Sequence, residues 1–112
     1  MSQITTHILD TTTGKPAPGV TIILYQHQNG QWKETGKGIT NQDGRVTDLL
    51  VKDFVLPFGN YKMKFETKEY FDKQMIQTFY PYIEIVFEIK NIEHYHIPLL
   101  LSPFGYSTYR GS

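Results

Sequence analysis

The chain has 112 residues, of which 39% are apolar and 20% are charged, and this length and composition predict one globular domain over residues 1–112. Its 11 Lys and Arg are balanced by 11 Asp and Glu, which argues against nucleic acid as a partner, and no run of 18 apolar residues indicates a membrane span. Because cysteine is absent, disulfides, thiolate metal sites and cysteine nucleophiles are excluded. The first residues lack the basic and apolar regions of a secretory leader, so we expect a cytoplasmic protein.

Short segments of alternating or β-branched residues, separated by turn residues, predict an all-β chain. Strands are expected at residues 3–10, 20–28, 32–40, 45–49, 60–66, 83–89, 94–101 and 105–110. Asn29-Gly30 is typical of a hairpin turn and joins the second strand to the third. Residues 67–75 change to helical spacing, and Thr67 is expected to cap this single short helix. About eight strands and one helix predict an antiparallel Greek-key β-sandwich.

The histidines and Arg45 are the first candidates for a site. His7 lies in the middle of the first predicted strand, and His94 and His96 share one face of the seventh because side chains repeat every two residues. Together these three histidines can be drawn as a zinc site, but the two-residue pattern is weak and a role without metal is favoured. Taken singly, Arg45 after the second turn is interpreted as a solvated charge, and His27 beside the hairpin turn as a solvated residue.

The last part of the chain, residues 94–112, combines two histidines, several tyrosines and Arg110 around an apolar run. Chain ends usually fray unless something holds them, so this composition predicts an end that is built into structure and into a site. Ser112 has no Gly-x-Ser-x-Gly elbow around it and is not expected to be a serine nucleophile. The aromatic last strand, with Tyr106 and Tyr109, would be an exposed edge, and we expect it to pair with a second copy.

Three blocks of this sequence resemble the transthyretin-related 5-hydroxyisourate hydrolases. They are Thr-His-Ile-Leu-Asp at 6–10, Asp-Gly-Arg-Val at 43–46, and His-Tyr-His-Ile-Pro-Leu-Leu-Leu-Ser-Pro at 94–103 with Tyr-Arg-Gly-Ser at 109–112. The closing Tyr-Arg-Gly-Ser separates this family's hydrolases from the hormone-carrying transthyretins of the same fold, which lack it and the histidines. The resemblance implies a transthyretin-like sandwich, a purine substrate and a homotetramer, built as a dimer of dimers with its sites in the channel between dimers.

The resemblance also implies roles for particular residues, in a reaction that needs no cofactor and no covalent intermediate. A neutral His7 or His96 would activate water, and Arg45 would grip the substrate and oppose the developing oxyanion. The implied catalytic residues are His7, Arg45, His96 and Ser112, and the implied substrate-binding residues are His7, Arg45, Tyr109 and Arg110. Two alternatives stay open: a carrier that binds a ligand without turning it over, and a zinc-dependent hydrolase that uses His7, His94 and His96.

Overall fold

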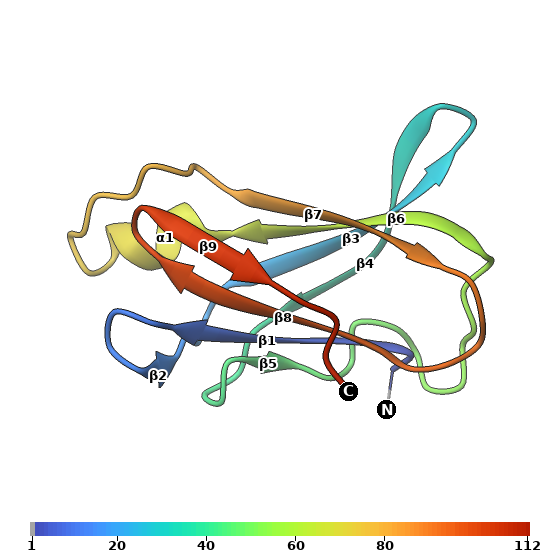
Figure 1. Ribbon diagram of the computed structural model, residues 1–112, viewed down its shortest axis with the longest axis horizontal. Helices are drawn as coiled ribbons and strands as arrows, with labels where there is room; N and C mark the ends of the chain where they lie inside the picture. Colours follow the sequence, from blue (N-terminus) through green and yellow to red (C-terminus); the bar gives the residue numbers. More distant parts are fainter. Residues whose placement is uncertain (1) are drawn as a thin grey trace.

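The computed structural model describes residues 2–112, which form two β-sheets and one helix (Figure 1). One sheet has the order β2-β1-β8-β9, with β5 also paired to β1, and the other has the order β4-β3-β6-β7. The elements are β1 (Ile4–Asp10), β2 (Lys15–Pro16), β3 (Thr21–Gln28), β4 (Gln31–Ile39), β5 (Arg45–Val46), β6 (Gly59–Glu66), α1 (Thr67–Asp72), β7 (Ile83–Ile89), β8 (Tyr95–Ser102) and β9 (Gly105–Thr108). The predicted all-β sandwich with one short helix is confirmed.

The strand pairing differs from the prediction at one place. Most pairs are antiparallel, including the predicted β3–β4 hairpin, but β1 and β8 run parallel from Ile4 opposite Tyr95 to Asp10 opposite Leu101. Parallel neighbours need a long crossover connection, and here the whole second sheet and the helix lie between β1 and β8 in the chain. The predicted strand at 45–49 is also shorter, because the chain turns away after Val46 and buries Leu49 and Leu50 in the core.

Alternation along β1 and β8 separates a core face from an outer face. Ile4 and Ile8 of β1 and Leu99 of β8 are fully buried in the core between the sheets. The residues between them point the other way, so that His7 and His96 are each partly exposed on the outer face. This placement follows directly from the two-residue period of a strand.

Helix α1 lies at one end of the sandwich and does not begin as predicted (Figure 1). The N-cap position belongs to Glu66 and has no side-chain capping bond, whereas Thr67 is a buried residue inside the helix. The helix ends at Asp72, and Met75 adopts a left-handed conformation with φ of 56° soon after it. Within the described part of the chain, no helix is long and apolar enough to cross a membrane.

A hydrogen bond of 2.8 Å from the Tyr70 hydroxyl to the Asp10 carboxylate fastens α1 to the end of β1. Burial and the bond to Asp10 raise the pKa of Tyr70 to about 12. We expect Tyr70→Phe to lower the free energy of unfolding by about 1.5–3 kcal/mol, because a bond to a charged group is lost. Urea unfolding at pH 7 measures this loss.

The control for this variant is Tyr82→Phe, since Tyr82 is largely exposed and its ring packs under the Lys64 ammonium without needing the hydroxyl. Because the folded pKa of Tyr70 is raised, its contribution is full below the unfolded value of about 10 and is lost as the pH rises through about 12. Equal stability of the two variants would contradict a role for the Tyr70–Asp10 bond.

Candidate functional site

The candidate site is centred on β1, which pairs with β5 on one side and with β8 on the other. Arg45 of β5 is directly opposite His7, and His96 of β8 is directly opposite Thr5. Residues opposite one another project from the same face, and neighbouring strands lie about 4.8 Å apart. The structure therefore brings His7, Arg45 and His96 together on the outer face of this sheet.

The turn before β5 places Arg45 beside β1. Asn41 Oδ1 accepts hydrogen bonds from the backbone amides of Asp43 and Arg45, at 2.9 and 3.1 Å. Gly44 has a φ of 72°, and a Cβ atom there would lie 2.6 Å from the carbonyl oxygen of Ile8. Glycine is required at this point because both the conformation and the space exclude a side chain.

Burial has the largest effect on the pKa of both imidazoles, and the charge of the Arg45 guanidinium has the second largest. Burial and then the charge of Arg45 lower the pKa of His7, against a smaller opposing effect of the Asp43 backbone and carboxylate. The pKa of His96 is lowered by burial, by Arg45 and then by the charges of His94 and His7. Both rings are therefore neutral at neutral pH and free to accept a proton.

The hydroxyl of Thr5 lies between two histidine rings. Its Oγ1 atom is 2.8 Å from Nδ1 of His96 and 2.8 Å from Nε2 of His94. The two rings are stacked, with centroids 6.3 Å apart and an interplanar angle of 22°. Thr5 itself is buried, whereas His96 is partly exposed and His94 is exposed.

The C-terminal tail is attached to the start of β8. The backbone amide of Gly111 donates to the carbonyl oxygen of His96 at 2.8 Å. The Arg110 guanidinium lies 4.3 Å from the ring centroid of Tyr95 and forms an ion pair with Glu93 at 3.3 Å. Gly111 therefore holds the tail beside His96, and Ser112 follows it as an exposed residue.

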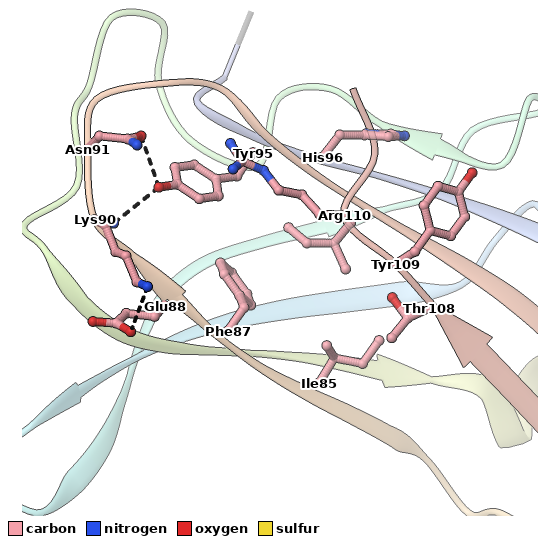
Figure 2. Close-up of a pocket in the computed structure, with 11 residues that line it drawn as sticks. Ile85, Phe87, Glu88, Lys90, Asn91, Tyr95, His96, Thr108, Tyr109 and Arg110 are labelled. Atoms are coloured by element: carbon pink, nitrogen blue, oxygen red, sulfur yellow. Dashed lines mark hydrogen bonds and ion pairs between the residues drawn. The ribbon is translucent and has the colours of Figure 1, made fainter.

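Next to the tail is a cavity of about 390 Å³ that opens between β7 and the β8–β9 pair (Figure 2). Ile85, Phe87, Tyr109 and Arg110 are among the residues that line it. In Figure 2 the His96 ring points away from Phe87. Of the proposed site residues, His96, Tyr109 and Arg110 line this cavity within one chain, whereas His7 and Arg45 do not.

Comparison with known proteins places the chain in a family. A sequence profile described as the HIUase/Transthyretin family matches residues 4–111. The chain belongs to this family. Among its relatives, the 5-hydroxyisourate hydrolase of Salmonella dublin is 48% identical over 110 residues, which cover 97% of this chain and 80% of that protein. The 5-hydroxyisourate hydrolase of Mus musculus is 45% identical over 114 residues, covering 99% of this chain and 96% of that protein.

Solved structures similar to this chain include both a hydrolase and a transthyretin with bound thyroxine. The 5-hydroxyisourate hydrolase of Klebsiella pneumoniae is 37% identical and superposes with a TM-score of 0.85, covering 97% of this chain and 98% of that one. Sea bream transthyretin in complex with thyroxine is 32% identical and superposes with a TM-score of 0.91, covering 98% and 95%. A hydrolase and a thyroxine-binding protein thus share the fold of the HIUase/Transthyretin family, so the fold alone does not assign a function.

The alternative of a zinc site formed by His7, His94 and His96 is not supported by the arrangement of these side chains. In residues 2–112, no group of three His, Cys, Asp or Glu side chains comes together in a way that could hold a metal ion. His94 and His96 instead share the hydroxyl of Thr5, and the positive charge of Arg45 acts on both His7 and His96. A cation at this position would be opposed by that charge.

Thr5 is the residue of this site that the sequence analysis did not single out. Its position on the same face as His7 follows from strand alternation. Its contact with His94 and His96 depends on the parallel register of β1 and β8, which local sequence patterns do not specify.

Proposed function

We propose that this protein is a cytoplasmic hydrolase that opens the ring of 5-hydroxyisourate to give 2-oxo-4-hydroxy-4-carboxy-5-ureidoimidazoline, a step of urate catabolism. The observation that carries this proposal is the cluster of two neutral imidazoles and one guanidinium, His7, His96 and Arg45, on one sheet face. The names of the relatives from Salmonella dublin and Mus musculus support the same substrate. The absence of cysteine suits a reducing compartment.

The reaction divides among the side chains according to their chemistry. A neutral imidazole, that of His7 or His96, takes a proton from water while the water oxygen attacks a ring carbonyl carbon of the substrate. Arg45 carries a permanent charge on a planar fork of donors, so it holds the substrate and stabilises the oxygen that becomes negative. When the ring C–N bond breaks, the imidazolium returns its proton to the leaving nitrogen. The protein forms no covalent bond to the substrate.

The tail supplies the remaining proposed roles. Tyr109 and Arg110 bind the substrate, and Ser112, at the end of the tail beside His96, supports catalysis. What favours this is the bond from the Gly111 amide to the His96 carbonyl, which keeps the tail next to an imidazole. Within one chain, the Arg110 guanidinium is paired with Glu93. We propose that Arg110 contacts the substrate at the interface between subunits.

Turnover of freshly generated 5-hydroxyisourate tests the function. The substrate is produced enzymatically from urate, and its disappearance is followed by absorbance with and without the protein. A hydrolase accelerates the decay above the spontaneous rate and yields a single stereoisomer of the product. A carrier of the transthyretin kind would bind without acceleration, and that result would overturn the proposal.

We further propose a homotetramer built as a dimer of dimers. Strands β7 and β9 are edge strands, each paired on one side only, and β7 exposes Val86, which is 60% accessible. Unpaired edges of this kind are uncommon in stable monomers, because their backbone groups invite another strand. Light scattering over a range of concentrations is expected to give the mass of four chains, and a concentration-independent monomer would refute this assembly.

The contact between Gly111 and the His96 ring yields a prediction about activity. A Cβ atom at residue 111 would lie 2.5 Å from Cδ2 of His96, so Gly111→Ala must displace the ring or release the tail. Because a shift of about 1 Å in a catalytic group can cost about 10²-fold, we expect kcat to fall by that order. Steady-state kinetics on enzymatically produced substrate measures the effect.

Gly105→Ala is the matched control for this change. A Cβ atom at residue 105 would meet only Ser102 Oγ at 3.6 Å, an ordinary contact, and should leave kcat near the wild-type value. If Gly111→Ala and Gly105→Ala retain the same kcat, the tail does not position His96.

A further inference from the structure

The Thr5 hydroxyl has to satisfy two histidine nitrogens with a single proton. Its oxygen lies 2.8 Å from His96 Nδ1 and 2.8 Å from His94 Nε2. A hydroxyl donates one hydrogen bond and accepts others, whereas a neutral imidazole has one nitrogen that donates and one that accepts. Consequently at least one of the two rings must donate to Thr5, and the tautomers of His94 and His96 are coupled through it.

The surroundings of His96 indicate which nitrogen carries the proton. Its Nδ1 atom is occupied by the Thr5 hydroxyl at 2.8 Å, so Nε2 is the nitrogen that remains for a water molecule. A neutral imidazole with a lone pair on Nε2 carries its proton on Nδ1. The other charged or titratable groups that act on this ring are Arg45 of β5, His7 of β1 and His94.

We propose that Thr5 is a positioning residue that holds His96 as the tautomer protonated on Nδ1, while the Thr5 hydroxyl donates its own proton to Nε2 of His94. In this arrangement Nε2 of His96 carries a free lone pair and is the atom that takes the proton from water. The inference rests on the proposed hydrolase function and deepens it, because it selects His96 over His7 as the base. His94 takes part as the acceptor that keeps the hydroxyl proton away from His96.

The neighbouring threonine shows that a purely structural hydroxyl on β1 is bonded differently. Thr6 points to the core side, and its Oγ1 donates to the carbonyl oxygen of Ile97 at 2.6 Å. Both threonines are buried and both bridge β1 to β8, but only the Thr5 hydroxyl contacts imidazole nitrogens. Thr6→Val therefore reports the cost of losing a buried hydroxyl between these strands without altering a histidine.

The first test compares Thr5→Val, Thr5→Ser and Thr6→Val in the full-length protein. Nitrogen NMR of histidine-labelled protein reads the tautomer of His96 directly and requires no substrate. We expect a proton on Nδ1 of His96 in the wild type and in Thr5→Ser, and loss of this preference in Thr5→Val. We also expect Thr5→Val to lower kcat about tenfold or more with KM little changed, because general base catalysis contributes about 10²–10⁴-fold in total. Thr5→Ser should restore most of the rate.

A second test uses His94→Phe, which retains an aromatic ring but removes the acceptor. The freed hydroxyl can then donate to Nδ1 of His96, so this variant should lower kcat in the wild-type background and have no further effect in Thr5→Val. Non-additivity of this kind is the signature of two residues that act through one interaction.

Two results would overturn the inference: a wild-type His96 protonated on Nε2, or a Thr5→Val protein that keeps both the tautomer and kcat. If Thr5→Val fails to fold, the wild-type tautomer and the His94→Phe variant still decide the matter. Failure of the proposed function has a different signature, since the wild type would then show the Nδ1 tautomer of His96 and yet leave 5-hydroxyisourate to decay spontaneously.

Discussion

Replacing His96 with alanine should lower kcat for 5-hydroxyisourate hydrolysis by about 10²–10⁴-fold, the usual contribution of a general base. The imidazole that is removed is neutral near pH 7, because burial and the Arg45 charge lower its pKa, and it lies beside both Thr5 and the tail. The loss should appear in kcat more than in KM, since the base acts on water and not on the bound substrate. Steady-state kinetics on freshly produced substrate measures both constants.

The control for this substitution is His27→Ala. His27 is an exposed residue of β3 in the other sheet, where it packs edge-on against Trp32 with ring centroids 4.9 Å apart. Its variant should retain the wild-type kcat. Thermal unfolding of both variants separates catalytic from structural loss, and a His96→Ala protein that is folded and fully active would remove the proposed base.

The second large effect is expected for Arg45→Met, which keeps an unbranched apolar side chain and removes the charge and the donors. Loss of a donor that faces a developing oxyanion costs about 10²- to 10³-fold in kcat in other enzymes, and Arg45 is proposed to hold the substrate as well. Both kcat and kcat/KM should therefore fall. Arg45 is exposed, so the effect on stability should be small in comparison.

The same variant should change the pH dependence of the residual activity. The Arg45 charge lowers the pKa of His7 and of His96, so removing it raises both values. A raised pKa means that more imidazolium is present at mildly acidic pH, and the acid side of the kcat/KM profile should move to higher pH.

Lys33→Met is the matched control for the loss of one positive charge. Lys33 is an exposed residue of β4 in the other sheet, so its removal should leave the pH profile where it is in the wild type. An Arg45→Met profile that coincides with that of the wild type would show that Arg45 does not act on the histidines.

Local sequence patterns were sufficient for most of the fold. Alternation explains why His7 is on the face of β1 opposite the buried Ile8, and the Asn29-Gly30 turn predicted the β3–β4 hairpin. The helix start was wrong because Thr67, a good capping residue by type, is buried inside α1 instead. The parallel pairing of β1 with β8 was missed because register between distant strands depends on how the complete sheet packs.

The candidate site was predictable in part. Resemblance to the family pointed to His7, Arg45 and His96, and the register of β1 with β5 and β8 explains why these three lie together. No pattern within one strand could reveal Thr5, because its contacts are made with residues 89 and 91 positions away. Tyr109, Arg110 and Ser112 remain predictions whose roles depend on the assembly.

The parallel pairing of β1 with β8 has a consequence for how the protein acquires its activity in the cell. Strand β1 leaves the ribosome early and its short partners β2 and β5 follow, but β8, its neighbour on the other side, is synthesised only after most of the remaining chain. Contacts between such distant segments form slowly and late. We therefore expect nascent chains to carry a first strand with one unpaired edge that chaperones can recognise, and to become competent for catalysis only near the end of translation.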